Sequence, residues 1–243
     1  MTIPSYRYVA GALLATIILS LFGVTHKAHS QNDNKDGWQY VTEEYSVRLY
    51  YRPYPQSKIP EFKAITTVQS SMASIIAVLL DSEACALWVH QCKESFPLHV
   101  VNDAEQIVYQ INDLPLAKDR DIILLARMEV ADDTRSVKIF LKTASDYCNK
   151  ANPGCEKIDH NKYIHVVDSH GFYLLEQESQ NQVKVTWQHY VDPAGKLPDW
   201  LARSQLKNLP LKTLHQLRNI VKEDKYQRTT LIFSDGIVRL EHQ

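Results

Sequence analysis

The sequence is poor in glycine, and it lacks the short motifs that mark several common enzyme classes. It has seven glycines among 243 residues, with neither a glycine-rich phosphate loop nor a G-x-S-x-G segment. Nucleotide-binding and hydrolase sites of those types are therefore disfavoured, and we expect no cofactor. The formal net charge of −1 also leaves no large basic face, so we expect no nucleic-acid partner.

The first 30 residues differ from the rest of the chain. Arg7 precedes an apolar run over residues 9–24, and small residues stand at Ala28 and Ser30, as in a cleavage site. We predict a secretory signal peptide over residues 1–30 that is cleaved near Ser30, so that the mature protein is periplasmic or secreted. An N-terminal membrane anchor is the alternative, although the apolar run is shorter than the roughly 20 residues that a spanning helix needs.

Four cysteines fall into two close pairs, Cys85 with Cys92 and Cys148 with Cys155. An exported protein meets oxidising conditions in which such pairs can form disulfides. The second pair is the stronger candidate, because asparagine, proline and glycine between its members favour a turn. The first pair would lie about 10 Å apart on an unbroken helix, so a bond there requires the helix to end between them. A four-cysteine zinc site would need closer spacing within each pair.

Hydrophobic periodicity predicts a single α+β domain after a polar lead over residues 31–37. Helical spacing predicts a helix over 70–80 and a shorter one around 83–89. The later strands are separated by short polar segments, as in an antiparallel meander. The predicted strands are 38–52, 62–68, 98–102, 106–111, 121–130, 137–141, 163–167, 172–177 and 183–190.

The C-terminal part carries two prolines at expected helix starts. One helical piece begins near Trp200, after Pro198, and Pro210 is expected as the first residue of a longer helix through about residue 225. Apolar residues recur there at spacings of three and four and form one stripe that another surface must cover. The stripe consists of Leu211, Leu214, Leu217 and Val221. The tail, residues 226–243, contains a hairpin turn signal at 234–236.

Two arginines near the predicted strand 121–130 have different expected roles. Arg120 belongs to the charged run 118–121, which is typical of a solvated turn before a strand. Arg127 interrupts an apolar strand, and a cation there needs a carboxylate or a ligand head group as its partner. The sequence therefore favours Arg127 over Arg120 as a polar contact for a ligand.

Histidines and carboxylates gather between residues 159 and 170, and they raise the question of a metal site. Imidazole and carboxylate can bind a divalent cation, but strand alternation would send His165 and Asp168 to opposite faces. We favour exposed loop histidines and expect no metal site. The cluster comprises Asp159, His160, His165, Asp168 and His170.

The strand 183–190 presents Val183, Val185, Trp187 and His189 on one face. As part of a core, this face needs only partners for the indole and imidazole nitrogens. As part of a cavity wall, the same atoms would offer an apolar surface with two polar groups. The strand alone leaves both interpretations open.

Several motifs, taken in order, resemble the START domain, the steroidogenic-acute-regulatory-related lipid-transfer family, in its bacterial form. Each motif is weak alone, but together they cover residues 38–222. They are Trp88 with 92–95 (CKES), 107–110 (IVYQ), 114–115 (LP), 118–121 (KDRD), 171–173 (GFY), 185–187 (VTW) and 192–201 (DPAGKLPDWL). Ala194 departs from the bacterial pattern, in which glycine is common at that position.

The resemblance implies a helix-grip fold over residues 38–225, in which a curved antiparallel sheet wraps around a long C-terminal helix. A hydrophobic tunnel between them would hold one lipid or sterol, without a covalent catalytic step. Within this frame we expect nine residues to line the tunnel: Tyr109, Arg127, Val185, Trp187, His189, Leu211, Leu214, Leu217 and Val221.

We expect a lipid or other hydrophobic small molecule as the partner of a monomeric, non-enzymatic chain that makes transient contact with a membrane. Two alternatives remain open. One is an enzyme of cyclase or hydrolase type that uses His189 with a carboxylate. The other is a module that binds a protein in the same groove.

Overall fold

We describe the protein from a computed structural model that covers residues 36–150, 152–159, 161–234 and 237–242. The predicted signal peptide lies outside these residues. The main element is a 10-stranded sheet in which nine strands follow the order β1-β2-β3-β10-β9-β7-β6-β5-β4. Its strands are β1 (Gln39–Glu44), β2 (Val47–Arg52), β3 (Glu61–Val68), β4 (Cys92–Asn102), β5 (Glu105–Asn112), β6 (Arg120–Val130), β7 (Ser136–Thr143), β8 (Ile164–His165), β9 (Asp168–Ser179) and β10 (Gln182–Asp192).

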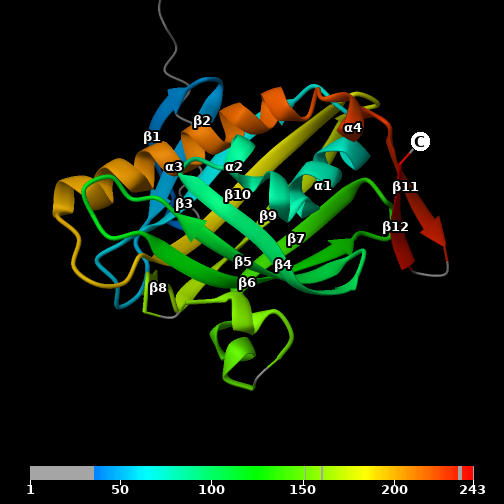
Figure 1. The fold of residues 1–243 in the computed structure, drawn as a ribbon. Helices are drawn as coiled ribbons and strands as arrows, with labels where there is room; N and C mark the ends of the chain where they lie inside the picture. The colour runs from blue at the N-terminus through cyan, green and yellow to red at the C-terminus, as the bar shows by residue number, and fades with distance from the viewer. Residues whose placement is uncertain (1–35, 151, 160, 235–236, 243) are drawn as a thin grey trace, which may run out of the picture. The chain divides into compact units, whose positions relative to one another are not determined.

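The helices connect and cover this sheet. Figure 1 shows the long helix α3 lying across one face of the curved sheet, with α1 and α2 beside it. This is the helix-grip arrangement of a curved antiparallel sheet around a C-terminal helix. The helices are α1 (Met72–Leu80), α2 (Cys85–Trp88), α3 (Asp199–Ile220) and α4 (Asp224–Gln227), with 3₁₀ turns η2 (Ser82–Ala84), η3 (Ser145–Lys150) and η4 (Cys155–Lys157).

The helical connection after β3 carries the chain to the far edge of the sheet. Ser71 caps α1 by accepting a hydrogen bond from the backbone N–H of Ser74 at 3.1 Å, which satisfies a donor that the first turn leaves free. From β4 the strands then return along the sheet until β10 pairs antiparallel with β3. The middle of the sheet, under α3, is therefore formed by β3 and β10, which are far apart in the sequence.

The predicted strand over 38–52 is in fact a hairpin of β1 and β2. Tyr45 and Ser46 form its turn with φ values of 55° and 59°, and Glu44 pairs with Val47 across it. A two-residue turn with both φ values positive fits the twist of the strands, but asparagine and glycine are its usual residues. Neither residue is present at 45 or 46, so the sequence carried no turn signal and the period-two alternation predicted one continuous strand.

The predicted strand over 163–167 is also different in the structure. Only Ile164 and His165 form β8, and they pair parallel to Arg120 and Asp121 of β6. The predicted strand at 98–102 is longer, since β4 begins at Cys92. In the C-terminal tail, β11 (Thr229–Ser234) and β12 (Ile237–His242) pair as a separate antiparallel hairpin.

Pro210 lies inside α3 and does not begin a new helix. The helix runs from Asp199 to Ile220, and the expected extension to about residue 225 is replaced by the separate short helix α4. Pro210 lacks the N–H that would bond to the carbonyl of Leu206, a loss that a long helix accepts when its surroundings hold it in place. Pro210 is buried, so packing supplies that support.

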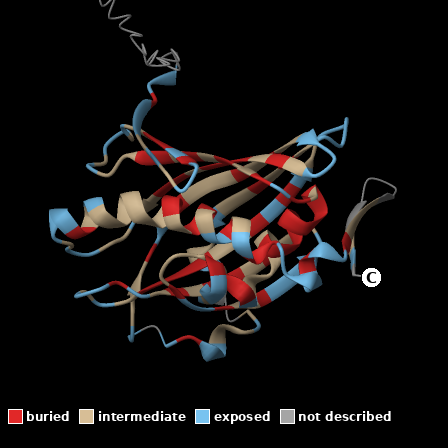
Figure 2. Ribbon diagram, turned by 90° about the horizontal axis from the view of Figure 1, so that it is seen from above, coloured by how far each residue is buried: buried red, intermediate tan, exposed pale blue. Residues whose placement is uncertain are grey.

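The main core lies between the sheet and the second half of α3, which we define as residues 210–220. Figure 2 shows buried positions gathered along this half and on α1, whereas α3 begins with two exposed residues, Asp199 and Trp200. Leu211, Leu214 and Leu217 of the stripe are 0–1% exposed and pack with Val185 and Leu175 of the sheet. A curved sheet thus covers the stripe directly.

Both disulfides form in the structure. Helix α2 ends at Trp88 and the chain turns back through Gln91, whose φ is 65°, which brings Cys85 and Cys92 to a Cα–Cα distance of 5.9 Å. The second bridge, Cys148–Cys155, belongs to the segment 144–163. In Figure 1 this segment lies on the side of the sheet opposite to α3. The two bridges fit an oxidising, exported location.

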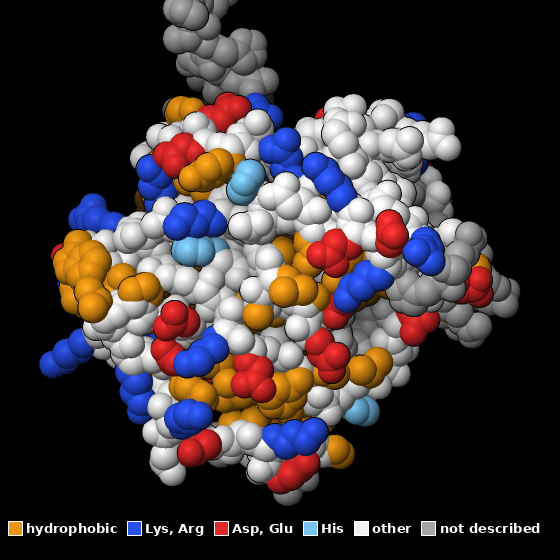
Figure 3. All heavy atoms as spheres, turned by 45° about the horizontal axis from the view of Figure 1, so that its top comes forward, with side chains coloured by type: hydrophobic (Ala, Val, Ile, Leu, Met, Phe, Trp, Pro, Cys, Tyr) orange, Lys and Arg blue, Asp and Glu red, His pale blue; other side chains and the backbone are white. Residues whose placement is uncertain are grey.

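The outer face of β5 and β6 is covered by that same segment. Ile158 belongs to a small second cluster that includes Tyr109 and Ile123, and Tyr147 and Tyr163 pack against this cluster. On the face drawn in Figure 3, apolar side chains reach the surface in separate groups bordered by charged side chains of both signs. Within the described part of the chain, none of the helices combines the length and apolar character needed to cross a bilayer.

Candidate ligand-binding site

A cavity of about 250 Å³ lies between the sheet and the helices, next to the main core. This volume is close to the lower end of the range of roughly 300–1,000 Å³ that is typical of small-molecule sites. Its walls come from β5, β6 and β10 of the sheet, from the corner between α1 and α2, and from the first half of α3, residues 199–209. The cavity therefore lies between the sheet and the first half of α3, where the helix does not pack directly on the sheet.

Strand alternation decides which side chains of β5 and β6 reach the cavity. On both strands every second residue lines it, because successive side chains point to opposite faces of a sheet. The lining residues are Gln106, Val108, Gln110 and Asn112 on β5, and Arg120, Ile122, Leu124 and Ala126 on β6. The alternate residues, among them Tyr109, Asp121 and Arg127, belong to the outer face.

The β10 wall is aromatic, with buried polar atoms that lack partners. Trp187 stacks on Tyr173 with ring centroids 5.0 Å apart, and it meets Phe62 edge-on at 4.8 Å. Its indole N–H and that of Trp88 have no hydrogen-bond acceptor among the described residues. Because leaving a buried donor unpaired costs about 1–3 kcal/mol, these groups favour a ligand or water in the cavity.

His189 on the same wall is held neutral by burial. Its Nε2 lies 2.7 Å from the Ser169 hydroxyl, while Nδ1 has no described partner and packs close to Gly171. Desolvation, with a smaller contribution from His170, lowers the pKa of His189 to about 3. An imidazole with so low a pKa is a weak general base at neutral pH.

The first half of α3 covers the cavity with Ala202, Gln205, Leu206 and Leu209. The amide oxygen of Gln205 is buried without a described partner, like the two indole N–H groups. Among the described residues, four of the five buried side-chain atoms that lack a partner thus belong to residues lining the cavity: Trp88, Trp187, His189 and Gln205. Their concentration in one place makes the cavity the candidate ligand-binding site.

Arg120 stands at the end of the cavity near the turn between β10 and α3, and it is 2% exposed. Its Nε donates to the carbonyl of Pro193 at 3.1 Å and Nη2 donates to that of Ala194 at 3.2 Å. Nη1 donates to the carbonyl of Lys118. Burial lowers the pKa of this guanidinium, against a smaller opposing effect of Asp119. The expectation of a solvated turn at Arg120 was therefore wrong.

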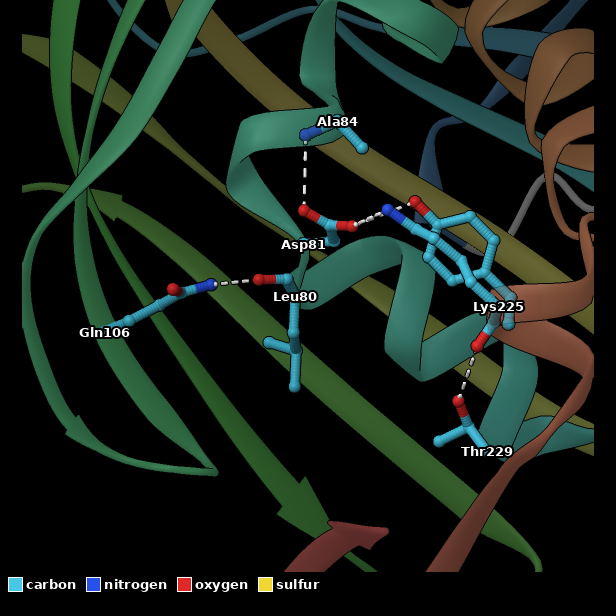
Figure 4. Close-up of polar contacts among 7 residues, drawn as sticks. Leu80, Asp81, Ala84, Gln106, Lys225 and Thr229 are labelled. Atoms are coloured by element: carbon cyan, nitrogen blue, oxygen red, sulfur yellow. Dashed lines mark hydrogen bonds and ion pairs between the residues drawn. The ribbon is translucent and has the colours of Figure 1, made fainter. Parts of the chain in front are cut away.

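Asp81, after α1, also lines the cavity and links it to the C-terminal segment. Figure 4 shows its carboxylate between the backbone N–H of Ala84 and the Lys225 ammonium, which lies 2.7 Å away. The Tyr226 hydroxyl donates to the same oxygen at 2.9 Å. Burial by itself would raise the pKa of Asp81, but these hydrogen bonds outweigh it and lower the pKa.

Of the residues expected to line the cavity, Trp187 and His189 do so. Val185 and the helical stripe Leu211, Leu214, Leu217 and Val221 are 0–1% exposed within the main core instead. Tyr109 lies on the outer face, where its hydroxyl donates to Asp121 at 2.8 Å. Arg127 is exposed and pairs with Glu129 at 2.7 Å, so the charge is compensated at the surface and makes no contact with the cavity.

The histidines and carboxylates between 159 and 170 do not converge. His165 pairs with Asp121 at 3.1 Å, and His170 pairs with Asp168 at 3.5 Å. Among the described residues no three histidines, cysteines or carboxylates come together as metal ligands would. His160 lies outside the described residues.

Sequence reasoning missed Arg120, the amides of β5 and the first half of α3. Arg120 shares a face with Ile122 and Leu124, but Ile123 and Leu125 make the other face equally apolar, so the sequence carried no sign of which face is inside. Arg127 lies on the other face from Arg120, and only the structure shows that this face is the outer one. The first half of α3 carries no equally regular apolar stripe, so its role depended on where the helix crosses the sheet.

Comparisons with known proteins agree with this architecture. The chain is 26% identical over 215 residues to the uncharacterized protein PA1579 of Pseudomonas aeruginosa, an alignment that covers 88% of this chain and 98% of that protein. It is similar to the crystal structure of a fragment of a STAR-related lipid transfer protein from Xanthomonas axonopodis, with a TM-score of 0.68 and 25% identity, over 77% of this chain and 100% of that chain.

Human StAR-related lipid transfer protein 5 shares the fold with a TM-score of 0.66 at 12% identity, over 79% of this chain and 89% of that chain. The START domain profile matches residues 25–226, which is most of the sequence. The sheet order, the crossing helix and this match lead to one conclusion. The chain belongs to the START domain family.

Proposed function

We propose that this protein binds a lipid or similar hydrophobic molecule in the cavity and carries or stores it without a covalent step. The observation that supports the proposal is the cavity itself. Aromatic and aliphatic side chains line most of it, together with a few polar atoms that have no partner among the described residues. Apolar burial at roughly 25 cal/mol per Å² would supply most of the affinity, and the few polar groups would orient the ligand. The family and the STAR-related lipid transfer protein from Xanthomonas support this function.

An enzyme in the same cavity would require His189 to act with a carboxylate. The described neighbours of His189 are Ser169 and the rings of Phe62 and Trp187, and no described carboxylate bonds to it. The orienting third group of a nucleophile triad is therefore missing, and the low pKa weakens the base. We favour binding over catalysis for this reason.

Delivery from this cavity would take place at a membrane after export, as the predicted signal peptide implies. Leu116 in the loop before β6 is 92% exposed, and Trp200 in the first turn of α3 is 59% exposed. Arg120 bonds to the segment before β6 and to the segment before α3, so the two segments that lead to these residues meet at the same end of the cavity. Flotation with lipid vesicles tests the contact, and protein that never associates with vesicles would contradict it.

Uptake of the uncharged dye Nile red by delipidated mature protein tests the binding function. We expect fluorescence to rise on binding and native mass spectrometry to detect one bound lipid after incubation with a lipid extract. Leu206→Trp would fill the cavity from α3 and lower dye affinity about tenfold or more, which corresponds to roughly 1.4 kcal/mol. Leu87→Trp is the matched control, because Leu87 is 65% exposed on α2.

If the wild-type protein takes up neither dye nor lipid, the proposed function is wrong. Equal loss of affinity in the Leu206 and Leu87 variants would instead show that the dye binds elsewhere than in this cavity.

A further inference from the structure

Charge is distributed unevenly among the residues that line the cavity. Asp81 and Arg120 are the only lining residues with permanently charged side chains in the described part of the chain. Asp81 is compensated by Lys225 at 2.7 Å. None of the described carboxylates forms an ion pair with Arg120, whose hydrogen-bond acceptors in the described part of the chain are all backbone carbonyls. The cavity thus holds one buried positive charge that no described carboxylate contacts directly, since Asp119 acts on it only at longer range and pairs with Lys93.

A buried cation of this kind is costly unless something compensates it. Carbonyl dipoles satisfy three of the five N–H donors of the guanidinium, but they do not neutralise its charge. Two further donors line the same cavity, because the indole N–H groups of Trp88 and Trp187 have no acceptor among the described residues. The cavity therefore offers positive charge and free donors, which a ligand with acceptor oxygens would match.

We infer that the natural ligand is an amphiphile with an anionic oxygen head group that lies at Arg120, and an apolar body that extends along Trp88, Trp187 and Leu206. This inference rests on the proposed binding function and specifies its ligand class. A carboxylate or a phosphate would fit the guanidinium equally, since it binds either group through paired N–H donors.

The inference separates two roles that Arg120 can have. As a clamp alone, it would fix the turn at Pro193 and Ala194 onto β6 and would be indifferent to the ligand's charge. As a head-group site, it would in addition favour anionic over neutral ligands of the same length. Ligands that differ only in the head group distinguish the two roles.

Displacement of Nile red by three ligands with the same twelve-carbon chain provides the test: dodecanoate, dodecyl phosphate and dodecanol. We expect at least one of the two anions to displace the dye at concentrations about tenfold or more below that of dodecanol, because a charge-assisted, paired hydrogen bond is lost with the alcohol. In Arg120→Gln the concentrations of the anions that displace the dye should come within about twofold of the concentration of dodecanol that does so. Arg127→Gln, which removes the same charge from the outer face of β6, should keep the wild-type preference.

Comparison of the two anions identifies the head group. A wild-type protein that binds acid, phosphate and alcohol equally overturns the inference and leaves the binding function intact, with Arg120 as a clamp. A preference that survives in Arg120→Gln also overturns it. Failure of all three ligands to displace the dye, together with no uptake of the dye itself, would overturn the proposed function.

A pH series in the wild-type protein keeps the test decisive if Arg120→Gln does not fold. Below about pH 4 dodecanoate is largely protonated, as carboxylic acids are. Its advantage over dodecanol should then disappear, whereas an advantage that persists at that pH contradicts a charge-based head-group site. Arg120→Lys should retain part of the preference, since it keeps the charge but loses the planar pair of donors.

Discussion

The two halves of α3 belong to one continuous helix but face different surroundings. The second half carries Leu211, Leu214 and Leu217, which are 0–1% exposed and pack directly on the sheet. The first half carries Ala202, Leu206 and Leu209, which are only partly buried and line the cavity. The regular stripe therefore marks the part of the helix that holds the fold together, and the less regular part is the one available to a ligand.

This difference has a physical basis in how tightly each surface is filled. A stripe with leucine at every third or fourth residue matches a facing apolar sheet and leaves no space between them. Smaller and polar residues such as Ala202 and Gln205 interrupt the first half, so its surface cannot close against the sheet in the same way. A binding cavity thus forms where the helix pattern is least regular.

Truncation of one leucine in each half gives the largest expected contrast. Leu214→Ala should lower the free energy of unfolding by about 2–5 kcal/mol, because it leaves a void in a filled core. Leu206→Ala should cost about 1 kcal/mol, since its side chain is partly exposed and already borders empty space. Urea denaturation measures both values. Equal losses would show that the two halves are packed alike.

The pH dependence of stability tests whether water is excluded from His189 in the cavity that faces the first half of α3. The pKa of His189 is lowered by burial to about 3, whereas it is near 6.5 in the unfolded chain, so the unfolded state binds one more proton between these values. The free energy of unfolding therefore has its full value, as far as His189 is concerned, above pH 6.5. It falls as the pH is lowered, by about 2 kcal/mol at pH 5.

His189→Gln should remove this part of the pH dependence, as measured by urea denaturation from pH 7.5 to pH 4.5. Parallel pH profiles for the variant and the wild type would mean that His189 is protonated in the folded protein, in a cavity accessible to water.

Loss of the contact between Asp81 and the segment after α3 should give the smallest decrease in the free energy of unfolding. Asp81→Asn removes an ion pair with Lys225 and weakens the hydrogen bond from Tyr226, at a cost of about 1 kcal/mol because Lys225 is exposed to solvent. The pKa of Asp81 is lowered in the folded state, so this stabilisation is present above the unfolded carboxyl value near 3.9 and is lost as the pH falls below it.

The difference in unfolding free energy between Asp81→Asn and the wild type should therefore shrink toward pH 3. A difference that stays constant with pH would assign the effect to packing. Dye affinity in the first-half cavity should change little in this variant.

Much of the fold could be predicted from local pattern. Alternation located most strands of the meander, and helical spacing located α1 and the second half of α3. Wrong predictions arose where the usual residue of a turn or break was absent or misleading. Tyr45 and Ser46 make a hairpin turn without asparagine or glycine, and Pro210 continues a helix that it was expected to begin.

The candidate site was harder to predict, because it depends on which face of each strand is inside. Trp187 and His189 line the cavity, whereas Val185 on the same face of β10 lies in the main core, so the pattern of the strand did not separate wall from core. On β6 both faces are covered, by the cavity on one side and by the segment 144–163 on the other. Arg120 and Arg127 then differ only in parity, and an apolar strand offers no compositional sign of which parity faces inward.

The sequence by itself determined the elements, their order and the family, because these follow from periodicities and motifs that act along the chain. It also determined that the leucine stripe must be covered. Only the tertiary structure decided that the stripe is sealed against the sheet while the preceding turns of α3 border a cavity. The physical reason is that a cavity is what packing leaves unfilled, and that depends on surfaces brought together from distant parts of the chain.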